Sequence, residues 1–152
     1  MLYLQQNSNF ISRILSIDFG IKRCGIAISD PLKIIANAYD VISPDKIFDE
    51  LKKIIKEKEI DTIVVGYPVN LKGEKTETTL IVEKFIEQLK NKFPEIEIVK
   101  FDERLTSKMA QQTLIITQTK KSQRQNKSNT DLISATILLQ NYLDNINIKN
   151  KL

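Results

Sequence analysis

The chain has 152 residues, of which 41% are hydrophobic and 28% charged, and its formal net charge is +4. This length and composition predict one domain with a single substantial core. The absence of histidine excludes histidine-based nucleophile pairs, histidine general bases and histidine-ligated zinc. The single cysteine, Cys24, excludes an internal disulfide, and we expect it to be a small core residue. Any catalysis must therefore use carboxylates, lysines, hydroxyls or a bound cation.

Neither a signal peptide nor a membrane span is evident in the sequence. Residues 1–12 are polar and lack the positively charged start and apolar run of a signal peptide. No stretch approaches the roughly 20 apolar residues of a membrane span. We expect a cytoplasmic protein that does not contact membranes, with a polar N-terminal extension (1–12), one domain (13–144) and a frayed tail (145–152).

The most informative stretch is the run ILSIDFG at 14–20, which is short, apolar and ended by a glycine, as a buried strand is. A second short strand at 25–29 follows at once, so the two predict a hairpin with Asp18 at its rim. A carboxylate on a core strand is costly to bury unless backbone N–H groups, a cation or a metal ion satisfy it. Asp18 is therefore the first candidate for a functional residue.

The remaining elements follow from hydrophobic periodicity and capping signals. In chain order they are a strand at 34–41, a helix begun by Ser43 and Pro44, a strand at 61–66, a helix begun by Thr76 or Thr78 and ended by Pro94, a strand at 96–101, a helix capped by Thr106 or Ser107, a mobile polar loop at 117–129, and a last helix capped by Asn129 or Thr130. This order predicts an α/β fold, a mixed five-stranded sheet flanked by helices. Ligands of such sheets bind at the carboxyl ends of strands.

Three acids lie where they can converge on one point. Asp18 ends the first strand, Asp102 or Glu103 ends a later strand, and Asp131 falls in the predicted first turn of the last helix. Converged carboxylates repel, and hard divalent cations, which take oxygen ligands, relieve that repulsion. Two such ions about 3.5–4 Å apart can activate water and stabilise the leaving oxygen of a phosphodiester. Each acid also has a structural alternative that stays open. Asp18 could be a turn residue, Glu103 could form a surface ion pair, and Asp131 could be a favourable charge at a helix N-terminus.

The positive charge is concentrated in one window. Residues 104–130 contain no acid and six basic residues: Arg104, Lys108, Lys120, Lys121, Arg124 and Lys127. Such a concentration attracts a polyanion, although a solvated charged surface is the alternative. No aromatic residue interrupts 120–127, which favours contact with phosphates over base stacking.

Four groups of motifs resemble the YqgF/RuvX family in order and spacing. They are SIDFG at 16–20 with GIA at 25–27, VGYP at 65–68 with Gly73, DERLT at 102–106, and DLISA at 131–135. The resemblance extends from Arg13 to Leu143. It implies an RNase H-like fold related to Holliday junction resolvases, and a nuclease that matures the 5′ end of bacterial pre-16S rRNA. Tyr67 stands where the family usually has leucine or a similar residue.

The resemblance also implies site residues. Asp18, Glu103 and Asp131 correspond to the catalytic acids that bind Mg²⁺ or Mn²⁺, which favours Glu103 over Asp102. Arg104 also matches the family motif, either as a phosphate clamp or as a structural partner of the acids.

We therefore expect a metal-dependent endonuclease that acts on structured RNA such as pre-16S rRNA, free or within the small ribosomal subunit, as a monomer or a homodimer. The basic residues Arg104, Lys120, Lys121, Arg124 and Lys127 would bind the phosphate backbone. One alternative is a resolvase that cuts branched DNA, which a two-fold dimer would favour. Another is a nucleic-acid-binding factor without catalysis, whose acids are structural and whose binding is insensitive to metal.

Overall fold

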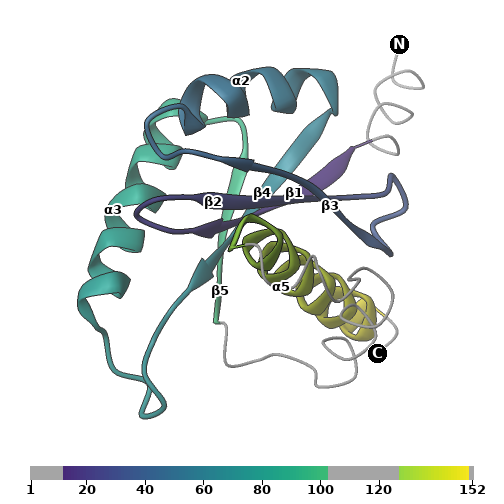
Figure 1. The fold of residues 1–152 in the computed structure, drawn as a ribbon. Coiled ribbons are helices and arrows are strands. Elements are labelled where there is room, and N and C mark those ends of the chain that lie inside the picture. Colours follow the sequence, from purple (N-terminus) through teal and green to yellow (C-terminus); the bar gives the residue numbers. More distant parts are fainter. Residues whose placement is uncertain (1–11, 103–126, 151–152) are drawn as a thin grey trace.

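The computed structural model describes residues 12–102 and 127–150 (Figure 1). Its elements in chain order are β1 (Arg13–Phe19), β2 (Cys24–Ser29), β3 (Ala36–Ile42), α2 (Ile47–Glu57), β4 (Ile60–Tyr67), α3 (Glu77–Lys92), β5 (Glu97–Asp102) and α5 (Lys127–Asn150). The strands form one five-stranded sheet in the order β3-β2-β1-β4-β5. β2 pairs antiparallel with β1 and β3, whereas β1, β4 and β5 run parallel. The predicted mixed five-stranded sheet is confirmed.

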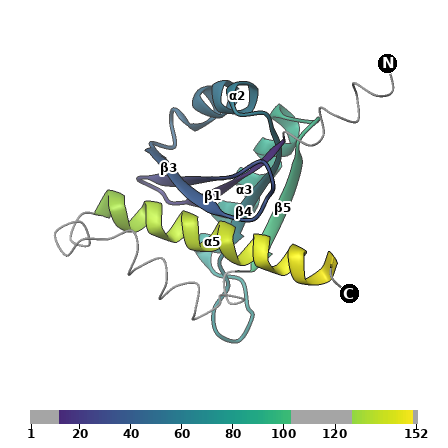
Figure 2. The same ribbon diagram turned by 90° about the vertical axis from the view of Figure 1, so that its right-hand side faces the viewer.

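Helices cover both faces of this sheet. Figure 2 shows α2 and α5 on opposite sides of it, and Figure 1 places α3 on the side of α2. Alternating side chains of the buried strands divide the core accordingly. Leu15 and Ile17 of β1 join the cluster that includes α2 and α3, whereas Ile14 joins the cluster formed with α5. Each face of β1 is thus assigned to one layer of helices.

The start of α3 confirms a local capping prediction. Thr76 is the N-cap, and its side chain accepts a hydrogen bond from the Thr79 backbone N–H at 3.3 Å. The Thr79 hydroxyl in turn accepts one from the Thr76 N–H at 2.9 Å, which completes a capping box. The helix ends at Lys92, before Pro94, as predicted.

Two other boundaries differ from the sequence prediction. Helix α2 begins at Ile47, because the Ser43 carbonyl accepts the Lys46 N–H at 3.0 Å in a preceding turn, so Ser43 is not the cap. Strand β3 begins at Ala36 and not at Ile34, because the Asp30 carboxylate accepts the backbone N–H groups of the two residues before Ala36, each at 2.8 Å. Those bonds hold the segment in a loop.

Helix α5 is longer than predicted at both ends. It begins at Lys127, so neither Asn129 nor Thr130 is its N-cap, and Asp131 is its fifth residue and lies beyond the first turn. It continues to Asn150, so residues 145–150 of the predicted frayed tail are helical. Side-chain amides fix this helix to the loop before β3.

These anchoring bonds come from two residues of α5. The Gln140 side chain bonds the Ile34 carbonyl and the Ala36 N–H, each at 2.9 Å, and Asn147 donates to the Lys33 carbonyl at 3.2 Å. The helix predicted from Thr106 or Ser107 and residues 117–126 of the predicted mobile loop lie outside the described residues. Residues 127–129 of that loop are helical, so the prediction was wrong there.

Across residues 12–102 and 127–150, we find no helix with the length and apolar character needed to cross a membrane.

Candidate active site

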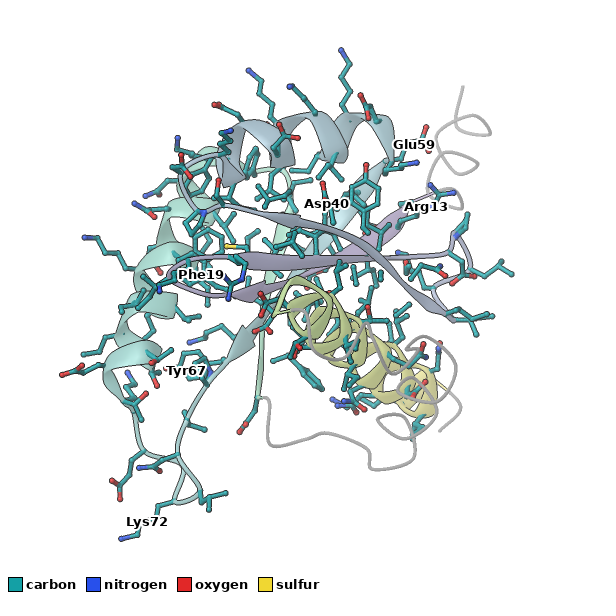
Figure 3. The ribbon with its side chains drawn as sticks, viewed as in Figure 1. Arg13, Phe19, Asp40, Glu59, Tyr67 and Lys72 are labelled. Carbon is teal, nitrogen blue, oxygen red and sulfur yellow. The ribbon has the colours of Figure 1, made fainter. Side chains whose placement is uncertain are left out.

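The carboxyl ends of β1 and β4 lie at one edge of the sheet. In Figure 3, Phe19 and Tyr67 mark these ends, while Arg13 and Glu59 lie toward the opposite edge. Asp18 directly precedes Phe19 and is half-buried. This is the edge at which ligands of parallel strands gather.

Helix α5 approaches this edge very closely at Gly25. A Cβ atom added to Gly25 would lie 2.2 Å from the backbone oxygen of Asp131 and 3.3 Å from the Cβ of Ala135. Only a glycine permits such an approach without a shift of the backbone. Gly25 is also the register partner of Asp18 across the β1–β2 pair. The packing therefore brings the Asp131 segment over the strand pair at the level of Asp18.

The orientation of Asp18 follows from its strand. The Ser16 hydroxyl is buried and donates to the Ala135 carbonyl of α5 at 2.8 Å. Because side chains two residues apart on a strand point to the same face, Asp18 faces α5 as Ser16 does. The structure thus brings Asp18 and Asp131, two acids singled out in the sequence, to the same face and the same edge of the sheet.

The thiol of Cys24 lies within the electrostatic reach of both acids. Burial is the main cause that raises its pKa to about 11, and a backbone hydrogen bond at Gly20 partly opposes this rise. The negative charges of Asp18 and Asp131 each raise this pKa further. The predicted role of Cys24 as a core residue is confirmed, because it is fully buried.

Arg23 forms an ion pair with one of these acids. Its Nε lies 2.8 Å from Oδ2 of Asp131, and the two side chains are 36% and 28% exposed. The turn that carries Arg23 is tight, since a Cβ on Gly20 would lie 2.5 Å from the Arg23 carbonyl oxygen. Arg23 was not among the residues predicted from the sequence. The available signal was an arginine in a short turn five residues after Asp18.

Asp102 lies on the other face of the sheet. Its neighbour Phe101 belongs to the core cluster of α5, so Asp102 points toward the α2 and α3 side. Its register partner Tyr67 packs against the cluster on that same side. Asp102 is therefore not directed toward Asp18.

Most of the other predicted site residues lie outside the part of the chain that the structure describes. Glu103, Arg104, Lys120, Lys121 and Arg124 lie outside the described residues, and Lys127 is the first residue of α5. Among the residues that the structure describes, no group of three or more His, Cys, Asp or Glu side chains is placed to hold a metal ion.

The donor chemistry of the two described acids suits Mg²⁺ or Mn²⁺. Asp18 and Asp131 offer carboxylate oxygens, the ligands that hard divalent cations prefer, and both are reachable from solvent. Asp131 already binds a positive charge here, that of Arg23. Two carboxylates at the same edge and on the same face of the sheet are compatible with a metal centre.

Comparison with known proteins identifies the family. The family model RuvX, described as "Holliday junction resolvase", matches residues 12–145. A protein of Flavobacterium psychrophilum named "Putative pre-16S rRNA nuclease" is 46% identical over 131 residues, which cover 86% of this chain and 96% of the relative. A protein of Sulfurihydrogenibium sp. with the same name is 41% identical over 143 residues, covering 93% and 96%.

The fold is also found in a solved structure. Thermus thermophilus RuvC, determined as "T. thermophilus RuvC in complex with Holliday junction substrate", matches with a TM-score of 0.51, covering 89% of this chain and 95% of that chain. The sequence identity is 10%, so this likeness shows the fold alone. From the family model and the relatives, the chain belongs to the RuvX/YqgF family of nucleases and has a RuvC-like RNase H fold.

Proposed function

We propose that this protein is a metal-dependent endonuclease that hydrolyses a phosphodiester bond at the 5′ end of pre-16S rRNA in the cytoplasm. The names of its relatives support the substrate. The main support for the active site is that the backbone of Asp131 packs on Gly25, which is the register partner of Asp18. This packing brings acids from the two ends of the domain to one edge of the sheet.

Asp18 and Asp131, together with Glu103, would hold Mg²⁺ or Mn²⁺. The choice of Glu103 over Asp102 is supported by the direction of Asp102, which points to the face away from α5. When bound, divalent ions activate a water molecule and stabilise the leaving oxygen. The carboxylates would hold these ions, and the buried strand β1 would keep Asp18 in place as a ligand.

The basic residues Arg104, Lys120, Lys121, Arg124 and Lys127 would bind the RNA backbone. Lys127 begins α5 four residues before Asp131, so its backbone lies about one helical turn, roughly 6 Å, from that acid. When several basic residues contact the phosphates of the RNA, the affinity for RNA falls steeply as the salt concentration rises. The RNA, free or in the small ribosomal subunit, would then be recognised through its shape.

The test is cleavage of a 5′-extended 16S rRNA fragment in Mg²⁺, Mn²⁺ or EDTA. We expect cutting in either metal, none in EDTA, and a loss of about 100-fold or more in Asp18→Asn and Asp131→Asn, since even indirect partners of a metal commonly contribute 10–100-fold. Asp49→Asn, an exposed acid on α2, is the matched control and should retain activity. Cutting in EDTA, or a fully active Asp18→Asn, would show that the proposal is wrong.

Branched DNA is the second candidate substrate, because the family model carries the description of a Holliday junction resolvase. A four-way junction incubated in parallel with the RNA separates the two. Metal-dependent cutting of the junction alone would assign the activity to DNA. Binding of both substrates without cutting, equally strong with and without metal, would instead indicate a non-catalytic binding factor.

A further inference from the structure

Arg23 is held beside the proposed metal site by its backbone and by its side chain. The Arg23 carbonyl packs closely on Gly20, where an added Cβ would lie 2.5 Å from it, and β2 begins at the next residue. Its guanidinium then reaches across to α5, over a separation of 108 residues, to bond Asp131. The cation of this ion pair therefore comes from the same hairpin that carries Asp18.

We propose that Arg23 exchanges partners during catalysis. It binds Asp131 before the metal arrives, and it binds a phosphate of the nucleic acid once a divalent ion has taken that carboxylate. This inference rests on the proposed function, because it requires the metal site at Asp18 and Asp131. It makes Arg23 a substrate-binding residue that links metal loading to substrate binding.

The exposure of the pair makes such an exchange feasible. With 36% of Arg23 and 28% of Asp131 exposed, water screens the attraction, and ion pairs of this kind contribute little net stability. A divalent ion with carboxylate ligands from two elements competes successfully against one such contact. The close packing of the turn on Gly20 would keep the released guanidinium near the site, because only the side chain has to move.

The chemistry of arginine fits both partners. A guanidinium offers five N–H donors in a planar fork that matches carboxylate and phosphate oxygens alike. Lysine provides a similar charge without this fork. The exchange therefore depends on the guanidinium as well as on its charge.

Mn²⁺ titration of the full chain, followed by the electron paramagnetic resonance signal of free Mn²⁺, tests the exchange without a need for turnover. In Arg23→Gln the competing cation is gone, so we expect Mn²⁺ to bind about two- to fivefold more tightly, the range that corresponds to an ion pair of this exposure. The KM for the cleaved nucleic acid should rise while kcat changes less, because a phosphate contact is lost.

Lys22→Gln is the matched control. Lys22 is exposed in the same turn and carries the same charge, so its loss should leave Mn²⁺ affinity and KM nearly unchanged. Arg23→Lys keeps the charge, and it provides a second test of the exchange if Arg23→Gln does not fold. It should bind Mn²⁺ almost as the wild type does and still show the raised KM.

Several outcomes would overturn the exchange. If Arg23 merely orients Asp131, its replacement by Gln will weaken Mn²⁺ binding or leave it unchanged. An equal tightening in Lys22→Gln would assign the effect to general charge and not to this pair. If Asp18→Asn and Asp131→Asn bind Mn²⁺ as the wild type does, the proposed metal site itself is wrong. If they lose Mn²⁺ while Arg23→Gln is unchanged, only the exchange is wrong.

Discussion

Gly25 is the residue on which the geometry of the site depends most. It allows the backbone of α5 to approach β2 at the position paired with Asp18. A glycine between apolar strand residues is a common sequence feature, and its partner here is more than 100 residues away along the chain. The pattern Gly-Ile-Ala predicts a strand, but it does not indicate which element packs against its glycine.

Gly25→Ala should destabilise the fold and displace Asp131. The added methyl group would lie 2.2 Å from a backbone oxygen, so α5 or β2 must shift, and overpacking of this kind costs about 1–3 kcal/mol. Urea unfolding followed by circular dichroism measures the loss, and Mn²⁺ titration measures the effect on the site. A variant as stable as the wild type, with the same Mn²⁺ affinity, would show that the contact is looser than the structure indicates.

Cys24 should be unreactive in the folded protein. Its thiol is buried and its pKa is raised to about 11, mainly by burial, so almost no thiolate exists at pH 8. Ellman's reagent at pH 8 should modify it rapidly in urea and very slowly in the native state.

The same shift in pKa gives Cys24 an effect on stability at high pH. The unfolded thiol releases its proton near pH 9.0, whereas the native thiol keeps it to about pH 11. The contribution of Cys24 to stability is therefore complete below pH 9 and is lost as the pH rises toward 11. Cys24→Ala should remove this part of the alkaline slope, and an unchanged slope would contradict the assignment.

At the scale of elements, the accuracy of prediction depended on how local the deciding contacts are. The start of α3 was predictable because its capping box involves residues only three positions apart, Thr76 and Thr79. The start and length of α5 were not, because its contacts reach Ser16, Ile34 and Lys33, each more than 100 residues away. Tertiary packing rather than capping propensity supplies most of the stability of such a helix.

The capping box of α3 provides a direct stability test. Thr76→Ala removes the side-chain acceptor for the Thr79 N–H and should cost about 1 kcal/mol. Thr78→Ala is the matched control, because Thr78 is exposed in the first turn and is the alternative start that the sequence left open. Its effect should stay within about 0.5 kcal/mol in the same urea titration. Equal losses in both variants would contradict the cap assignment.

In the candidate site too, residues could be predicted when the deciding contacts are local in sequence, and could not when those contacts are distant. Asp18 could be singled out because it is the one acid on a largely apolar buried strand. The choice between Asp102 and Glu103 needed the family resemblance, because both adjacent acids fit the spacing from Asp18 equally well. The ion pair between Arg23 and Asp131 joins a turn to a helix 108 residues later, and no local pattern encodes it.

On the scale of the whole molecule, two acids hold the loop between β2 and β3. Asp30 bonds the loop's own backbone, and Asp61 of β4 pairs with Lys33 of the loop at 3.0 Å. Partial burial opposes the ionisation of Asp30, but the backbone N–H groups of Ile35 and Ile34 outweigh it and lower the pKa. Burial likewise opposes the ionisation of Asp61, but hydrogen bonds from Ser12 and Lys33 lower its pKa. Both carboxylates are therefore more acidic in the folded protein than in the unfolded chain.

These shifts predict a loss of stability in acid. The contribution of each acid is present above its ordinary pKa of 3.8 and is lost as the pH falls through the lower native value. Urea unfolding between pH 5 and pH 2.5 should show this decline. Asp61→Asn should reduce the slope, because it removes the carboxyl that these hydrogen bonds make more acidic. A slope that Asp61→Asn leaves intact would assign the acid sensitivity to other groups.

The hydrogen bond between Ser16 and Ala135 joins residues 119 positions apart, and this distance has a consequence for folding. Contacts of such long range form late, because closing the intervening chain is entropically costly. Until α5 docks, the apolar side chains of Ile14, Val64 and Phe101 lack their cover, and Asp18 lacks Asp131. A molecule that has not finished folding thus does not have the paired acids. We therefore expect the fold and the candidate site to be completed in the same step, so that an incompletely folded chain is inactive.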